Sequence, residues 1–389
     1  MNMMVVSNGY GEDSIGTALA KELQKLDIKV TVLPLVGQGK SYEEQGLEVI
    51  GPRQDLPSGG FVFNRPGALQ KDIRAGFISM TLNQWQTLRR VSASFTGTLV
   101  VGDWYALSVA SFFAKRPLFQ MQPLVSLHYW QGEGAPKTGQ PYGLWERSLM
   151  KRVTKVYPRD EASTLWLNKH GINQAVYLGN PMLDALYGYC DINLPAPYLL
   201  LMPGSRADAY ESLPVMLEAC VLLQDLKLTP VVAWTGLPLR FDLANWHLVE
   251  TGQSAGITHR LEHKQGQVVY IAQKSFARLL KKAKLALSTS GTAAEQAAGY
   301  GVPVIAFPTL GPQYTPSFAL GQKRLLREAL TLVDPKPEYI AQAARGLLNN
   351  LTSYAVAQRA AKVAMGEPGA AQRIAKDIHY SLKSLKARS

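Results

Sequence analysis

Short apolar runs alternate with amphipathic segments along most of the chain, and this alternation predicts its fold class. In the first half we expect strands at residues 3–6, 29–33, 98–101 and 154–157, and helices at 106–113 and 161–170. Another helix follows the first strand, with an apolar side from Ile15 to Leu26 and with Asp13 or Ser14 as its cap. Strands separated by helices pair in parallel, so this half is predicted to form a doubly wound sheet.

The same alternation begins again after residues 186–197, which we interpret as a linker. The second half is predicted to have strands at 198–202, 230–234, 268–271, 285–288 and 302–307, and helices at 213–223, 276–280 and 293–299. The remainder is expected to be helical to the end of the chain. The sequence therefore predicts an α/β protein of two Rossmann-like domains, residues 1–187 and 188–366. A helix at 367–389 is expected to cross back to the first domain.

Composition limits the possible classes of protein. At 389 residues and 47% apolar content, the chain is long enough for two hydrophobic cores. Its two cysteines, Cys190 and Cys220, form no disulfide framework and no metal-binding spacing, which favours a reducing compartment. No signal peptide and no apolar run of about 18 residues is apparent, so we expect a cytoplasmic location.

The net charge of +12 favours an anionic partner, either nucleic acid, anionic lipid or a phosphorylated substrate. The charge is scattered and follows no nucleic-acid-binding motif, so nucleic acid is not expected. The six histidines are dispersed, and we expect no metal site.

Two segments of the second half resemble phosphate-binding turns. In the first, a strand runs into Ser290, Gly291 and Thr292 at a helix start, where free N–H groups and the helix dipole favour a phosphate. Glu295, one turn later, could hold a ribose diol. In the second, LLLMPGSR, the turn at Gly204, Ser205 and Arg206 offers a guanidinium for a diphosphate. Ordinary helix capping and a surface arginine are the alternatives.

Carboxylates follow two strands of the first half. Glu12 and Asp13 lie in the loop SNGYGEDS, and Asp103 comes directly after the strand in VVGDWYAL. A carboxylate at the carboxyl end of a parallel strand reaches the edge where ligands bind and can deprotonate a hydroxyl. Helix capping is again the alternative for Asp13 and for Asp103.

The order of these motifs resembles a known family. YLGNPMLD, LLMPGSR and STSGTAAEQAAGYGVPVI are similar to the GHPLxD, LPGSR and SGTATLEAALxGVPMV segments of lipid-A-disaccharide synthase, and closest to the branch called lipid-A-disaccharide synthase-related. SNGYGEDS resembles the SNGHGED motif of that branch, with Tyr10 in place of its His. VVGDWYAL resembles GIDxPDF but keeps one aspartate, Asp103. The resemblance covers most of the chain.

The resemblance implies a GT-B fold, in which two Rossmann-like domains face each other across a cleft. It also implies an inverting glycosyltransferase that takes a UDP-sugar and requires no metal. We expect no other cofactor, and we expect a lipid or glycolipid as the acceptor. Glu12, Asp13 or Asp103 would be the base, and the turns at 204–206 and 290–295 would hold the donor. A nucleotide-sugar epimerase of the same fold and a non-catalytic binding protein are the alternatives.

Residues 59–90 mix aromatic and apolar groups with cations such as Lys71, Arg74, Arg89 and Arg90. Such a segment suits peripheral attachment to the anionic inner face of a membrane. An amphipathic helix packed on the sheet is the alternative. Lys281, Lys282 and Lys284 lie in a second basic cluster, which we interpret as a solvated surface.

Overall fold

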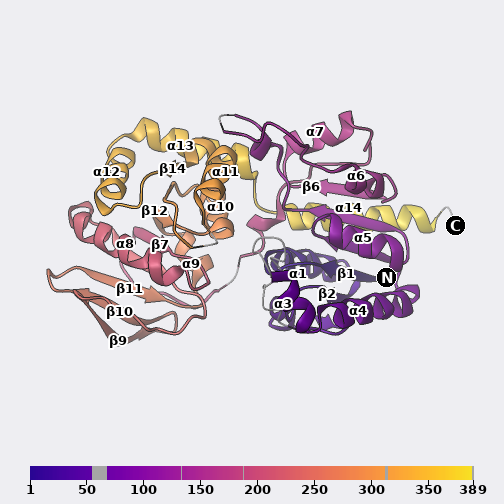
Figure 1. Cartoon of the computed structure of the whole chain (residues 1–389), viewed down its shortest axis with the longest axis horizontal. Helices are drawn as coiled ribbons and strands as arrows, with labels where there is room; N and C mark the ends of the chain where they lie inside the picture. Colours follow the sequence, from indigo (N-terminus) through magenta and orange to yellow (C-terminus); the bar gives the residue numbers. More distant parts are fainter. Residues whose placement is uncertain (55–67, 133, 187, 312–313, 388–389) are drawn as a thin grey trace. The chain divides into compact units, whose positions relative to one another are not determined.

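The computed structural model describes residues 1–54, 68–132, 134–186, 188–311 and 314–387 (Figure 1). The chain forms two compact units. The first contains residues 1–130, 136–185 and 367–389, and the second contains residues 131–135 and 186–366. Each unit is built around its own sheet, and helices cover that sheet. Among the described helices, none is long and apolar enough to cross a membrane.

The first unit has a six-stranded parallel sheet in the order β3-β2-β1-β4-β5-β6. Its strands are β1 (Asn2–Ser7), β2 (Lys29–Pro34), β3 (Glu48–Val49), β4 (Gly97–Val101), β5 (Leu118–Gln122) and β6 (Lys155–Pro158). The central strand β1 is apolar from Met3 to Val6, and these four side chains are fully buried. A strand with helices on both faces has no solvent side, which is why it lacks polar alternation.

The helices of the first unit are α1 (Tyr10–Gln24), α2 (Lys40–Glu43), α3 (Ala68–Arg74), α4 (Phe77–Val91), α5 (Trp104–Phe113), α6 (Leu144–Met150), α7 (Glu161–Lys169) and α14 (Ala370–Lys386). α1 packs against α14, whereas α4, α5 and α6 lie side by side in another layer (Figure 1). Right-handed crossovers in this strand order place α1 and α5 on opposite faces of the sheet.

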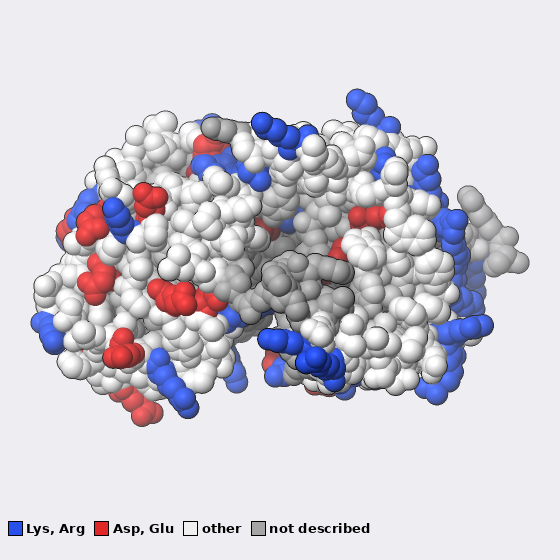
Figure 2. Space-filling view, in the orientation of Figure 1, with Lys and Arg blue, Asp and Glu red and all other residues white. Residues whose placement is uncertain are grey.

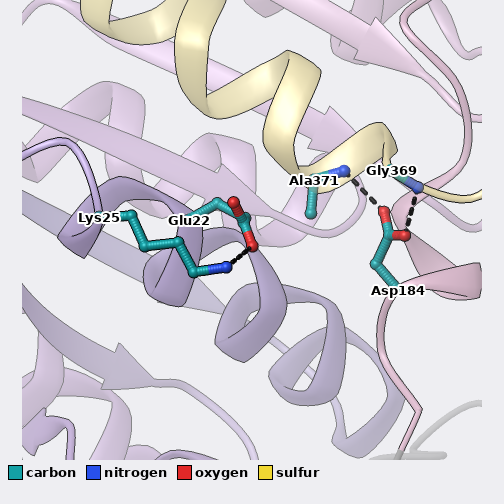
Figure 3. A network of polar contacts seen from close by, with 5 residues as sticks. All are labelled: Glu22, Lys25, Asp184, Gly369 and Ala371. Carbon is teal, nitrogen blue, oxygen red and sulfur yellow. Dashed lines mark hydrogen bonds and ion pairs between the residues drawn. The ribbon is translucent and has the colours of Figure 1, made fainter.

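The C-terminal helix α14 belongs to the first unit because specific contacts hold it there. The Asp184 carboxylate accepts hydrogen bonds from the backbone N–H groups of Gly369 and Ala371, at 2.5 and 2.7 Å (Figure 3). Farther along α14, Asp377 accepts from Lys155 Nζ at 2.9 Å and from the Tyr157 hydroxyl at 2.8 Å. Asp184 ends the YLGNPMLD motif, so this part of the motif anchors the start of α14.

The second unit has an eight-stranded sheet in the order β14-β13-β12-β7-β8-β11-β10-β9. Its strands are β7 (Tyr198–Met202), β8 (Thr229–Ala233), β9 (Trp246–Ser254), β10 (Ile257–His263), β11 (Val268–Ala272), β12 (Ala283–Ser288), β13 (Val304–Ala306) and β14 (Leu330–Leu332). The six strands from β14 to β11 pair in parallel. β10 pairs antiparallel with both β9 and β11, so this edge is not part of the doubly wound pattern.

The helices of the second unit are α8 (Ala209–Leu222), α9 (Phe276–Leu280), α10 (Gly291–Gly299), α11 (Pro316–Leu326), α12 (Pro337–Leu348) and α13 (Leu351–Met365). Leu199, Leu201, Leu285 and Leu287 of the central strands lie in a buried cluster with α8 and α12. The prediction of helix throughout the remainder was wrong, because the β14 strand lies within it. β5 and the β9–β10 hairpin were not predicted at all.

Candidate functional site

The loop after β1 is shorter than predicted. α1 already begins at Tyr10, and Gly9 is its N-cap residue. Asp13 and Ser14 therefore lie inside the helix, and the prediction that one of them caps it was wrong. Glu12 turns back toward the start of the helix, because a Cβ atom on Gly9 would lie only 2.3 Å from its Oε2 atom. The Glu12 carboxylate thus occupies the space beside Gly9 that a side chain would fill. A glutamate that turns back to the helix start in this way resembles the glutamate of a capping box.

Asp13 accepts the last of two consecutive hydrogen bonds in a buried network with the Tyr42 and Ser7 hydroxyl groups. The Tyr42 hydroxyl donates to Ser7 Oγ at 2.9 Å, and Ser7 Oγ donates to Asp13 Oδ1 at 2.6 Å. All three side chains are buried. A Cβ atom at Gly16 would lie 2.1 Å from the Tyr42 hydroxyl, so only glycine at this position leaves space for the Tyr42 side chain.

Asp103 is both a helix cap and a member of the same site. Its Oδ1 atom accepts from the Tyr105 backbone N–H at 2.9 Å, which caps α5, and from Asn8 Nδ2 at 2.8 Å. The Asn8 bond joins the loop after β1 to the loop after β4, and these two strands are neighbours. The capping interpretation is therefore correct for Asp103, and its carboxylate also lies at the edge where parallel strands place ligand-binding groups.

The structure adds a fourth carboxyl group, that of Glu146, which was not predicted from the sequence. Glu146 lies in the first turn of α6 and is 5% exposed. Gln122, the last residue of β5, donates to Glu146 Oε1 at 2.6 Å. Its signal in the sequence was weak, because a glutamate in a first helical turn is usually explained by the helix dipole. Only the tertiary contact between β5 and α6 reveals its position.

Burial raises the pKa of three of these carboxyl groups to about 7, those of Glu12, Asp13 and Glu146. Loss of hydration is the largest cause in each case, because the charged form is poorly solvated inside the protein. The charge of Asp103 raises the pKa of Glu12 and Glu146 further, and the charge of Glu12 raises that of Asp13. The first unit therefore contains a group of interacting carboxyls, three of which titrate near neutral pH.

In the second unit, the two predicted phosphate-binding turns follow neighbouring strands. β7 and β12 pair in parallel, so the turns after them share one edge of the sheet. Thr289 joins the turns, since its hydroxyl donates to the Pro203 carbonyl at 3.0 Å and its N–H donates to the Met202 carbonyl at 3.1 Å. The structure thus brings residues 204–206 and 290–292 to the same edge.

The start of α10 has the form predicted for it. Ser290 is the N-cap residue, yet its hydroxyl makes no side-chain capping bond. The Gly291 backbone is closely packed, because a Cβ atom there would lie 3.0 Å from the Phe318 ring. Thr292 is exposed, whereas Glu295, one turn further, is only 4% exposed. Free N–H groups at such a helix start can receive an anion.

The turn after β7 requires glycine at one position. Gly204 has φ +104°, a conformation that other residues adopt only with strain. Ser205 is exposed and Arg206 is partly buried, three residues before α8 begins. A cavity of about 570 Å³ opens beside this turn and is lined by Ala207, Tyr210, Arg240 and Phe241, among others.

No group of three or more metal-binding side chains occurs among the residues that the structure describes. His259 and His263 lie on β10, not on a helix.

Of the segment 59–90, residues 59–67 lie outside the described residues. In the part that follows them, α4 buries Met80 and Leu88 against the domain core, as the alternative of a packed amphipathic helix predicts. Its Ile78 and Leu82 side chains are exposed.

The whole architecture is similar to that of solved structures. UDP-GlcNAc 2-epimerase from Neisseria meningitidis, bound to UDP-GlcNAc, matches with a TM-score of 0.58 and 16% identity over 98% of this chain and 100% of the other. MurG from Acinetobacter baumannii matches with a TM-score of 0.55 and 15% identity over 97% and 99%. The chain has the GT-B fold. The glycosyltransferase CalG4 of calicheamicin matches similarly, with a TM-score of 0.60 and 14% identity over 98% of both chains.

Both glycosyltransferases and epimerases share this GT-B architecture, so the fold does not select one activity. A scan against protein-family models gives no match, and a search of curated proteins gives none either. The predicted fold class is confirmed, with the antiparallel β9–β11 edge as an addition to it.

Proposed function

We propose that this protein is a glycosyltransferase that moves a sugar from a UDP-sugar donor to a lipid-linked acceptor at a membrane surface. The observation that carries the proposal is the pair of adjacent turns in the second unit, after β7 and β12, within a GT-B chain. The lipid-A-disaccharide synthase-like motifs of the sequence coincide with these turns and with the anchor of α14. The solved proteins of similar fold bear names of glycosyltransferases and of epimerases that use UDP-GlcNAc.

In this proposal the donor diphosphate lies against the start of α10 and the Arg206 guanidinium. Negative charge grows on the diphosphate as the glycosidic bond breaks, and N–H groups that are already oriented stabilise it without reorganisation. Glu295 holds the ribose diol. Because Glu295 is 4% exposed, it would contact the ribose only through its carboxylate tip or after a small shift of α10.

The base is one of the four carboxyl groups described above in the first unit. Asp103 is the most exposed of the four carboxyls, and Glu12, Asp13 and Glu146 lie deeper. We assign proton removal from the acceptor hydroxyl to Asp103, with Glu12 and Asp13 as the neighbouring groups that set its electrostatic surroundings. The acceptor oxygen then attacks the anomeric carbon from the side opposite the leaving diphosphate, which inverts the configuration.

A nucleotide-sugar epimerase is the second candidate, favoured by the three carboxyls that titrate near neutral pH. Groups with such pKa values can both remove and return a proton, as an epimerisation requires. The two activities differ in their need for an acceptor. An epimerase converts the donor alone, whereas the proposed transferase releases UDP only when an acceptor is present.

The test is a product analysis by mass spectrometry of several UDP-sugars, each incubated with and without a bacterial lipid extract. UDP release and a glycolipid of increased mass, both dependent on the extract, are the expected results. An isomerised UDP-sugar formed without extract would replace the proposal by the epimerase. Binding of UDP without any turnover would support a non-catalytic nucleotide-binding protein instead.

A further inference from the structure

The layer formed by α4, α5 and α6 exposes large apolar side chains on the surface of the first unit. Phe112 of α5 is 60% exposed and Trp145 of α6 is 52% exposed, yet their rings stack on each other with centroids 6.1 Å apart. Leu144, beside Trp145, is 79% exposed, and α4 contributes Ile78 and Leu82. We call the surface made by these five side chains the α4–α6 face. Exposed apolar groups that gather on neighbouring helices, rather than singly, indicate a binding surface.

The three helices are held side by side, so their exposed groups form one surface. Trp85 of α4 stacks on Phe113 of α5 with ring centroids 5.1 Å apart. The Trp145 indole N–H donates to Ser108 Oγ at 3.0 Å, which fixes the exposed ring on α5. A large ring fixed in place at the surface loses little entropy when it is buried by a partner.

A pair of cations lies in the last turn of α4, and further pairs follow within three residues of the ends of α5 and α6. These pairs are Arg89 and Arg90, Lys115 and Arg116, and Lys151 and Arg152. The pairs lie near one another, because Lys115 Nζ donates to the Ala93 carbonyl at 3.3 Å and Arg116 Nη1 donates to the Arg152 carbonyl at 2.5 Å. No described carboxylate forms an ion pair with any of the six. Figure 2 shows Lys and Arg along this margin of the unit, beside a mostly white surface.

Acidic residues are nearly absent from this part of the chain. Between residues 73 and 159 the sequence has eleven Lys and Arg but only three Asp and Glu. Two of these three acids, Asp103 and Glu146, are among the four carboxyl-bearing residues of the candidate site. Helix dipoles favour cations at helix ends, but they do not account for the lack of acids around them. Apolar and aromatic groups bordered by unneutralised cations complement the apolar interior and the anionic headgroups of a bilayer.

We propose that the α4–α6 face binds the surface of an anionic phospholipid bilayer. The rings of Phe112 and Trp145 and the Leu144 side chain enter the interface, and the cations at the three helix ends contact the headgroups. The inference rests on the proposed function for its purpose, since it identifies where a lipid acceptor would be met. Its measurement is separate, because vesicle binding requires neither the donor nor catalysis.

The experiment is co-sedimentation of the full chain with vesicles of phosphatidylcholine, with and without phosphatidylglycerol. We expect binding that requires phosphatidylglycerol and weakens as salt is added. The double variant Phe112→Ser, Leu144→Ser should weaken it at least about tenfold. The triple variant Arg89→Gln, Arg90→Gln, Lys151→Gln should weaken it by about fivefold for each cation that contacts the headgroups.

Matched controls come from the second unit. Leu351 and Val363 are 83% and 66% exposed there, so Leu351→Ser, Val363→Ser controls for loss of exposed apolar side chains. Lys281→Gln, Lys282→Gln, Lys284→Gln removes the same number of exposed cations. Both controls should bind vesicles as the wild type does, and every variant should keep its UDP affinity.

Three results would overturn the inference. Equal binding to vesicles with and without phosphatidylglycerol would remove the role of the anionic headgroup. Equal loss in the control variants would assign binding to general charge and apolarity. A concentration-dependent dimer in analytical ultracentrifugation that Phe112→Ser disperses, without vesicle binding, would show that a second copy of this chain covers the face. Loss of UDP binding with normal vesicle binding would instead count against the proposed function alone.

Discussion

The buried Asp13 carboxyl should make the first unit less stable as the pH rises. Its pKa is raised from 3.8 to about 7 in the folded chain, mainly by burial. The folded protein therefore holds this proton more tightly than the unfolded chain does. The contribution of this bound proton to the unfolding free energy is at its maximum below about pH 4. It is lost as the pH rises toward and through about 7.

The variant Asp13→Asn removes this pH dependence, because an amide does not ionise and can still accept from Ser7 Oγ. Between about pH 5 and about pH 8 the wild type should lose about 2–3 kcal/mol of unfolding free energy from this carboxyl, and the variant should not. At about pH 8 the variant should therefore be the more stable of the two. A site residue whose removal stabilises the fold is one retained for activity rather than for stability.

The assay is urea unfolding, followed by tryptophan fluorescence, of both proteins at the two pH values. Glu22→Gln is the control, because Glu22 pairs with Lys25 at the surface (Figure 3) and should leave the pH dependence of the wild type unchanged. If wild type and Asp13→Asn show the same change in unfolding free energy between the two pH values, the Asp13 carboxyl does not cause the pH dependence. A variant that is less stable than the wild type at about pH 8 would equally contradict a destabilising role of the ionised Asp13 carboxylate.

Two further predictions concern packing in the first unit. Asp184→Ala removes the acceptor of two backbone N–H groups at the start of α14, so hydrogen exchange of this helix should show a loss of protection of about 1–2 kcal/mol, whereas Glu22→Ala should show none. Unchanged exchange would mean that Asp184 does not anchor α14. Gly16→Ala should displace the Tyr42 hydroxyl and lower the urea midpoint by the equivalent of about 1–3 kcal/mol, while Gly11→Ala, where a Cβ atom meets no neighbour, should not. Equal midpoints for the two alanine variants would contradict the close contact.

The central elements of both sheets could be predicted from the sequence because their signal is local. The apolar run at 198–202 is strand β7, residue for residue, and the short helix predicted at 276–280 is α9. Both are continuous apolar segments bounded by turns. By contrast, β9 carries the sequence WHLVETGQS, which is too polar to stand out as a strand. Pairing with β10 creates this strand, and such pairing is not visible in one segment.

The site shows the same division between local and tertiary signals. The turns at 204–206 and 290–292 are local strand-to-helix patterns, so their common edge follows once the strand order is known. The helix start at Gly9 was mispredicted, because Asp13 and Ser14 are better caps than glycine by residue preference alone. Tertiary contacts with Ser7 and Tyr42 override that preference. Glu146 lies in the site because α6 contacts the end of β5, where Gln122 donates to its carboxylate. No local sequence pattern predicts this contact.

Calorimetric titration with UDP measures whether the turns after β7 and β12 of the second unit bind the donor nucleotide. We predict that UDP binds the wild type with and without EDTA, more tightly than GDP or ADP does. Arg206→Ala and Glu295→Ala should each weaken binding by about tenfold or more, because each removes a charged hydrogen-bonding partner. Arg260→Ala, which breaks only a partly exposed ion pair with Glu262, should not. Absence of binding by any nucleotide, or equal UDP affinity in wild type, Arg206→Ala and Glu295→Ala, would contradict a donor site at these turns.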